Sequence, residues 1–272
     1  MKPVRVYEHP LSPYAQKVKI ALAEKGVPFE AVLPAAIGSG ASTGAFAAAN
    51  PRGEVPVLVD GEVTLFDSSV IVAYVEERWP EPPLLPDAPA ERARVRTLEE
   101  VMDTHYEAIN WGMAEILAFG RARGELAQRM LARAAAQTAA LQGWLEPHLE
   151  GRRWLNGERF GMGDLCVAPF VNGSLGFGNG PKAGTKLSDW LARANERPSV
   201  AAAARAARDA AAEAATSLGS VAELVESGRF KREYRDHRLE WIIRSGGLEI
   251  VLDGLAKDNI RFVEFARGGS EA

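Results

Sequence analysis

The chain has few residues or segments that could form covalent cross-links or anchor it in a lipid bilayer. Cys166 is the only cysteine among 272 residues, which excludes an internal disulfide and a CxxC redox pair. The longest purely apolar runs, such as "VIVAYV" at 70–75, are far too short to span a membrane. The first residues, "MKPVRVYEHP", lack the apolar stretch of a signal peptide, so we expect a cytoplasmic protein.

Excess positive charge and metal-ligand motifs are lacking too. The formal net charge is -4, which gives no electrostatic reason to expect nucleic acid or a membrane as a partner. The four histidines show no metal-ligand spacing, so we expect no metal site. What remains is the composition of an ordinary globular protein, 47% hydrophobic and 25% charged, and long enough for two domains.

The first 80 residues alternate between strand and helix patterns. A strand over 3–7, a helix over 13–25 and a strand over 29–33 predict a parallel crossover. Two further strands separated by an Asp-Gly pair, over 55–66, indicate a β-hairpin. A helix over about 69–79 closes the unit. The sequence therefore predicts a small α/β domain with the order βαβ-ββα over residues 1–80.

A proline-rich stretch separates this domain from a purely helical region. Residues 81–90 lie within "PEPPLLPDAPAE" and are predicted to be a linker. Residues 91–216 are predicted to form an all-α domain, because strand patterns are lacking there. Its expected helices span 91–119, 125–149, 162–175, 187–196 and 199–215.

The stretch "LSPYAQKV" (11–18) contains a serine at a strand-to-helix turn. Ser12 before Pro13 is a normal helix start, and capping alone would explain it. The same turn also places a hydroxyl beside free backbone N–H groups that favour an anion. In the helix that follows, Lys17 is expected away from the apolar face.

Two further stretches have both a structural and a functional explanation. Pro56 within a strand pattern indicates a strand start or edge, and the Val55–Pro56 bond is a candidate cis peptide. Asp67 and Ser68 stand at a helix start, where capping is the simpler explanation. The same groups suit an amino-acid head group, with N–H groups and the Ser68 hydroxyl on its carboxylate and Asp67 on its ammonium.

Four stretches in this order resemble the cytosolic glutathione transferase family: "SPYAQKVKIALAEKGVPFE", "NPRGEVPVLVDG", "LFDSSVIVAYVEERWP" and "FGMGDLCVAPFV". The resemblance covers residues 4 to about 210. It implies a thioredoxin-like N-terminal domain, an all-α C-terminal domain and a homodimer. It also implies glutathione as co-substrate, a small hydrophobic electrophile as second substrate, and a role in detoxification.

The resemblance assigns roles to individual residues. Ser12 matches the catalytic position, with Tyr7 at the end of the first strand as a rival hydroxyl. The implied glutathione-binding residues are Tyr14, Arg52, Glu54, Val55, Pro56, Asp67 and Ser68. The implied second-substrate pocket comprises Leu11, Tyr106, Asn110 and Met113, although core packing is an equally good account of some residues on this helix.

The sequence departs from the family pattern where the glycine carboxylate of glutathione would lie. Family members usually place a basic or amide side chain there, but residues 34–49 contain no Lys, Arg, His or Gln. Glu54 stands where many members have lysine. This departure favours a non-catalytic binding or regulatory protein of the same fold, which we keep as the alternative. The intact set of Ser12, Val55–Pro56 and Asp67–Ser68 favours an enzyme, and we expect a glutathione transferase.

The last segment, residues 217–272, is not explained by the family pattern. "RFKREYRDHRLEWIIRSGG" (229–247) predicts an amphipathic helix that packs on the helical domain. A lid over the second-substrate pocket and an added dimer contact are the alternatives.

Overall fold

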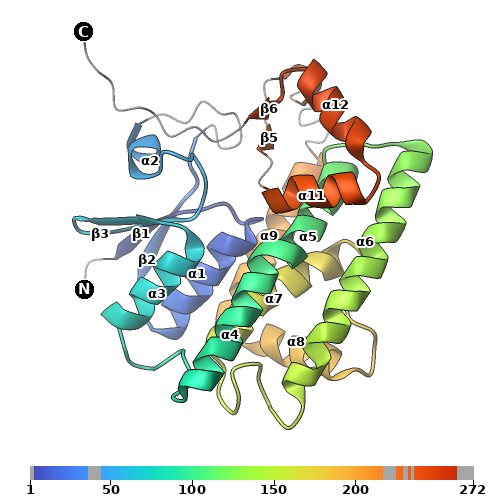
Figure 1. Cartoon of the computed structure of the whole chain (residues 1–272). Coiled ribbons are helices and arrows are strands. Elements are labelled where there is room, and N and C mark those ends of the chain that lie inside the picture. The colour runs from blue at the N-terminus through green and yellow to red at the C-terminus, as the bar shows by residue number, and fades with distance from the viewer. Residues whose placement is uncertain (1–2, 36–43, 217–224, 229–231, 234–235, 262–272) are drawn as a thin grey trace.

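The computed structural model describes residues 3–35, 44–216, 225–228, 232–233 and 236–261. A mixed sheet with its helices forms one side of the molecule, and a bundle of helices forms the other (Figure 1). Within the described residues no helix combines the length and apolarity needed to cross a membrane.

The N-terminal domain has the predicted order of strands and helices. Strands β1 and β2 are parallel, whereas β1 with β3 and β3 with β4 are antiparallel, in the order β2-β1-β3-β4. This confirms the predicted thioredoxin-like domain. The elements are β1 (Val4–Tyr7), α1 (Pro13–Glu24), β2 (Phe29–Val32), α2 (Gly44–Ala49), β3 (Val57–Asp60), β4 (Val63–Phe66) and α3 (Ser68–Arg78).

The two faces of this sheet are covered differently. Helices α1 and α3 pack together on one face, where Val6, Val18 and Ile71 are fully enclosed. Helix α2 lies over the opposite face (Figure 1), where Phe46 packs against Tyr7 and Val57. The small side chains of α2 therefore bury one aromatic ring and little else.

The helical domain confirms the predicted all-α class. The predicted helix over 91–119 is interrupted by a π-helical turn, which separates α4 from α5. The elements are α4 (Pro89–Val101), the π-helical turn (Met102–Tyr106), α5 (Glu107–Leu117), α6 (Gly124–Leu145), a 3-10 turn (Glu146–Leu149), α7 (Met162–Gly176), α8 (Lys186–Glu196) and α9 (Pro198–Thr216).

Helix α7 is the centre of this domain, and a buried carboxylate fixes its start. Asp164 is fully buried and accepts hydrogen bonds from the backbone N–H groups of Leu155, Asn156 and Gly161. It also accepts one from Trp190 Nε1 at 2.7 Å. A buried carboxylate with several donors organises the surrounding backbone, because each donor would otherwise be unsatisfied.

The C-terminal segment packs on the helical domain. Helices α11 (Asp236–Arg244) and α12 (Leu248–Ala256) lie over α5 and α6 (Figure 1). Two short parallel strands, β5 (Arg232–Glu233) and β6 (Ile260–Arg261), accompany them. The Trp241 ring lies against the backbone of α5 at Gly112, and its indole N–H donates to Gln137 of α6.

A second contact fixes the end of the segment. Arg121 Nε lies 3.2 Å from Glu115 Oε2, and both side chains are almost completely buried. The same arginine donates to Asn259 Oδ1 at 2.8 Å, and Asn259 is itself fully buried. Because a buried ion pair needs its remaining hydrogen bonds satisfied, Asn259 is part of the core of this domain.

Replacing Gly112 with alanine should destabilise the protein by about 1–3 kcal/mol, since a Cβ there would come within 2.7 Å of Trp241 ring atoms. Gly143→Ala on α6 is the matched control, because nothing lies within 4 Å of its Cβ position. That variant should be neutral or more stable, as alanine is the better helix former. Urea unfolding measures both, and equal stability of the two variants would contradict the packing of Trp241 on α5.

Candidate functional site

The predicted site residues meet at one edge of the sheet because of its register. Tyr7 at the end of β1 pairs with Val57 at the start of β3, which pairs with Phe66 at the end of β4. The segments that continue from these positions therefore leave the sheet on the same side. They carry Ser12, the Val55–Pro56 peptide, and the Asp67–Ser68 pair.

Ser12 is half-buried and caps α1. Its backbone is extended, and its Oγ accepts a hydrogen bond from Ala15 N at 3.2 Å. The turn before it is held by Gln16 Nε2, which donates to Pro10 O at 2.8 Å. A serine hydroxyl that accepts through a lone pair keeps its own proton to donate. Capping and donation to a ligand are thus compatible.

Val55 and Pro56 form a cis peptide directly before β3. Pro56 is buried, whereas Val55 is half-buried and precedes the paired residues of the strand. The Val55 backbone therefore lies at the margin of the sheet.

Asp67 and Ser68 start α3. Asp67 has a φ of 75°, a conformation that is costly for a residue with a side chain. Its Oδ1 accepts a hydrogen bond from Ser69 N at 3.1 Å, and Ser68 is buried at the first helical position. The N-terminus of α3 thus carries a carboxylate, a hydroxyl and the positive end of the helix dipole.

Buried Asn50 shapes the loop between α2 and Val55. Its amide nitrogen donates to Glu54 O at 2.8 Å, and its amide oxygen accepts from Arg52 N at 3.0 Å. This fold brings the Arg52 guanidinium within 3.8 Å of Asp67 and 3.9 Å of Glu54. The same guanidinium lies over the Phe66 ring, 5.8 Å from its centroid. Arg52 thus lies between two carboxylates.

Tyr14 is half-buried and contacts the helical domain. Its hydroxyl donates to Asp103 O at 2.6 Å, and its ring packs edge-on against Phe170. This side chain therefore joins α1 to the helical domain.

The implied second-substrate residues differ in their exposure. Tyr106 is fully enclosed and hydrogen-bonds to Ser174 and Gln142, and Met113 is buried among residues covered by the C-terminal segment. Both side chains are covered, Tyr106 by the helical core and Met113 by residues that include the C-terminal segment. Leu11 is 44% exposed, and Asn110 is half-buried and donates to Phe170 O.

Tyr7, the alternative to Ser12, packs on the face of the sheet that α2 covers. Tyr7 is buried, and its ring centroid lies 5.5 Å from that of Phe46 on α2. Ser12 therefore remains the hydroxyl at the start of α1.

Lys17 is the important residue that the sequence prediction misplaced. It was expected away from the apolar face of α1, but its side chain is completely buried. Its Nζ donates to Asp103 Oδ2 at 2.6 Å, Glu99 Oε1 at 2.8 Å and Ser69 Oγ at 3.2 Å. The spacing from Tyr14 and Ala21, three and four residues away, was the available signal.

The charges of this Lys17 cluster are strongly perturbed. Burial lowers the pKa of Lys17, but Asp103 and Glu99 outweigh burial and hold it above its usual value. Burial also raises the pKa of Asp103 to about 6, with Lys17 opposing and Glu99 adding to the rise. One buried ammonium is thus shared by two carboxylates, and Asp103 is the one more easily protonated.

The sheet topology and the helical domain define a two-domain protein with a thioredoxin-like N-terminal domain. Its polar candidate residues lie at the starts of α1 and α3. Residues 6–83 match the family described as "Glutathione S-transferase, N-terminal domain", and residues 109–198 match "Glutathione S-transferase, C-terminal domain". Glutathione S-transferase GstB of Escherichia coli is 30% identical over 190 residues, which cover 68% of this chain and 89% of that protein. The chain belongs to the glutathione S-transferase family.

Other comparisons agree on the fold and differ in the names of the proteins. FtsZ-localized protein A of Caulobacter vibrioides is 28% identical over 208 residues, covering 71% of this chain and 87% of that one. A glutathione S-transferase structure from Rhodospirillum rubrum is 32% identical with a TM-score of 0.64, covering 72% and 90%. A theta-class enzyme from Xanthomonas axonopodis, solved with glutathione bound, is 26% identical with a TM-score of 0.63, covering 75% and 98%.

Asp103→Asn should change how stability depends on pH. The pKa of Asp103 lies near 6 in the folded protein and near 3.9 when unfolded, so its ionisation destabilises the fold as pH rises between these values. Asparagine has no such penalty. The stability of the variant relative to wild type should therefore rise by about 2–3 kcal/mol from pH 4 to pH 7. Denaturant unfolding across this range measures the difference, and parallel profiles would refute the assignment.

Proposed function

We propose that this protein is a glutathione transferase that activates the thiol of glutathione at Ser12 and joins the sulfur to a small hydrophobic electrophile. The observation that carries the proposal is the hydroxyl of Ser12, which caps α1 while its proton stays available to a thiolate. In the reaction the thiol loses its proton to solvent. The thiolate then forms a bond to the electrophilic atom as the leaving group departs with the electrons of its own bond.

The energy required is within reach of these groups. A free thiol has a pKa of about 8.5, so only a few per cent is thiolate at neutral pH. Lowering that pKa by about two units needs about 2.7 kcal/mol of preferential stabilisation of the anion. A hydrogen bond from a hydroxyl to a charged sulfur and the N-terminus of α1 together supply energy of this order.

The cysteinyl backbone and the γ-glutamyl end of glutathione have matching groups at the same sheet edge. We expect the Val55 backbone to pair with the cysteinyl backbone, because Val55 precedes the strand and lies at its margin. Asp67 supplies a carboxylate for the γ-glutamyl ammonium, and the N-terminus of α3 with Ser68 supplies donors for its carboxylate. The Arg52 guanidinium lies 3.8 Å from the Asp67 carboxylate.

We place the electrophile beside Leu11, which is exposed next to Ser12. Tyr106 and Met113 are left out of this pocket because they are buried. We also propose that the protein is cytoplasmic and forms a homodimer, as the family resemblance implies, and that it serves in detoxification.

A non-catalytic role is the second candidate. The similarity to a protein named FtsZ-localized protein A favours it, since that name describes a location beside another protein and no reaction. The fold alone does not distinguish the two roles.

Glutathione binding and Ser12→Ala together test the proposal. Calorimetry should show saturable binding at millimolar glutathione or below, and turnover should be found in a panel of hydrophobic electrophiles. Ser12→Ala should raise the pKa of the bound thiol and reduce the rate at pH 6.5 by about 10- to 100-fold. Affinity should change little, because the other contacts remain.

Thr185→Ala is the matched control for capping. Thr185 Oγ1 accepts from Ser188 N at 3.2 Å at the start of α8, the same geometry as at Ser12. Both variants should lose about 1 kcal/mol of stability, but only Ser12→Ala should alter the thiol. A lack of glutathione binding would exclude the enzyme, and an unchanged rate in Ser12→Ala would exclude Ser12 as the activating group.

A further inference from the structure

We propose that His9 is a positioning residue for the reaction proposed above, because its backbone carbonyl and its imidazole Nδ1 together hold the turn that presents the Ser12 hydroxyl. His9 does not act on the thiol itself, and its effect passes through Ser12. The inference therefore rests on the proposed function and adds a residue to it.

Residues 9–12 form a turn that is closed by two hydrogen bonds to His9. Ser12 N donates to His9 O at 2.8 Å, which is the bond of a four-residue β-turn. Leu11 N donates to His9 Nδ1 at 3.2 Å. Pro10 stands at the second position of the turn, where its fixed φ is favoured. Ser12 is thus both the last residue of this turn and the cap of α1.

Two side chains hold the central peptide group of the turn, one at each end. This group joins Pro10 to Leu11, and its N–H is the donor that His9 Nδ1 accepts. Its carbonyl oxygen, Pro10 O, accepts from Gln16 Nε2 at 2.8 Å. The common β-turn types differ mainly in the orientation of this peptide group. His9 and Gln16 therefore fix one orientation, and with it the direction in which the chain enters Ser12.

The bond from Leu11 N also requires one protonation state of the ring. A neutral imidazole accepts only at the nitrogen that has no proton, so the proton of His9 lies on Nε2. An imidazolium donates at both nitrogens and would lose this bond. Burial lowers the pKa of His9 below its usual value, with Glu8 opposing and Lys19 adding to the effect, which leaves the ring neutral at pH 7.

A fixed turn matters more for the rate than for the affinity. The Ser12 hydroxyl stabilises a thiolate only from hydrogen-bond distance, and a misplacement of about 1 Å can reduce a rate by about 100-fold. The groups proposed for the rest of glutathione, Val55 and the Asp67–Ser68 pair, belong to β3 and α3 and not to this turn. Loss of the acceptor at Nδ1 should therefore lower kcat and leave KM for glutathione nearly unchanged.

Three substitutions of His9 test the role of Nδ1. His9→Ala removes the acceptor and should reduce kcat with one electrophile by about tenfold. Asparagine places its Oδ1 where Nδ1 lies, as in the turns that it forms with the N–H two residues on, so His9→Asn should keep most of the wild-type kcat. Glutamine places its oxygen one bond farther away, so His9→Gln should resemble His9→Ala. KM for glutathione should change by less than about twofold in all three.

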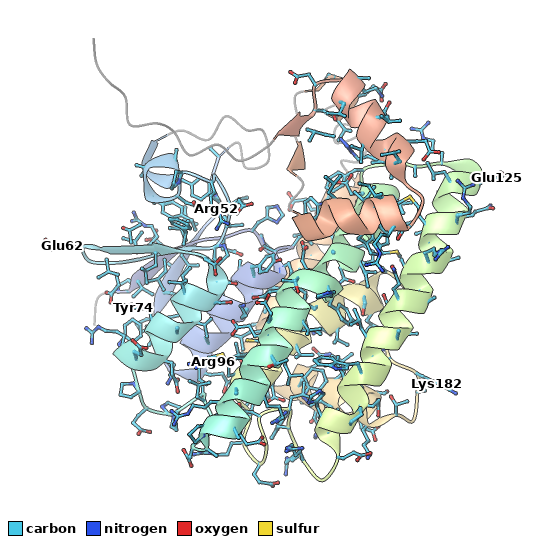
Figure 2. All side chains as sticks on the ribbon, viewed as in Figure 1. Arg52, Glu62, Tyr74, Arg96, Glu125 and Lys182 are labelled. Carbon is cyan, nitrogen blue, oxygen red and sulfur yellow. The ribbon has the colours of Figure 1, made fainter. Side chains whose placement is uncertain are left out.

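Thr185→Ala is the control for the loss of a side chain that binds the backbone. Thr185 Oγ1 accepts from Ser188 N at 3.2 Å, the same distance as between Leu11 N and His9 Nδ1. Thr185 also donates to Lys182 O, and Figure 2 shows Lys182 on the side of the molecule away from the sheet. This variant should keep the wild-type kcat. A wild-type kcat in His9→Ala, or equal losses in His9→Ala and His9→Asn, would overturn the proposal.

The protonation of the ring gives a second readout that does not depend on turnover. Long-range proton–nitrogen correlation spectra of the wild-type protein distinguish the two neutral tautomers of histidine, and the His9 signals are those that His9→Asn lacks. At pH 7 the His9 ring should be neutral with its proton on Nε2. A charged ring, or a proton on Nδ1, would overturn the role of Nδ1.

The outcomes also separate this inference from the proposed function. A loss of rate in Ser12→Ala without any loss in His9→Ala would overturn only the inference. A full rate in Ser12→Ala, or a lack of glutathione binding, would overturn both, because a positioned Ser12 hydroxyl would then have no reaction to serve.

Discussion

The buried ammonium of Lys17 is the interaction on which the relation of the two domains depends. It lies on α1, is completely buried, and binds oxygen atoms from α3 and from the helical domain. A charge removed from water is stable only when several partners are in place together. The starts of α1 and α3 therefore stand where they do because α4 and the π-helical turn hold them there.

This constraint explains how weak local features become a site. Ser12 and Asp67 are each ordinary helix caps, and Val55 is an ordinary residue at a strand margin. The sheet register places the three on one edge, and the Lys17 cluster fixes the angle between the two helices that start there. In the function proposed above, the positive end of the α1 dipole acts together with the hydroxyl of Ser12 on the thiol.

The C-terminal segment changes what the helical domain can expose. In a chain that ended near residue 216, Met113 and its neighbours on α5 would lie under no cover from α11. Here Trp241 lies against Gly112, and Ile242 and Ile250 complete a second apolar core. The residues of this segment lie beyond both matched family regions, so the family pattern alone could not place them.

The sequence by itself determined the class of both domains, since period-two and helical patterns, an Asp-Gly turn and a proline-rich linker are local signals. It also selected Ser12, Val55 and Asp67, because helix starts and strand prolines are visible in the order of residues. Only the tertiary structure decided that Lys17 is buried, that Tyr14 binds Asp103, and that Tyr106 and Met113 belong to cores. Burial depends on which surfaces of distant segments meet, and long side chains on the border of an apolar face can turn either way. The pairing of Arg52 with Asp67 was decided in the same manner, by a loop whose shape depends on one buried asparagine.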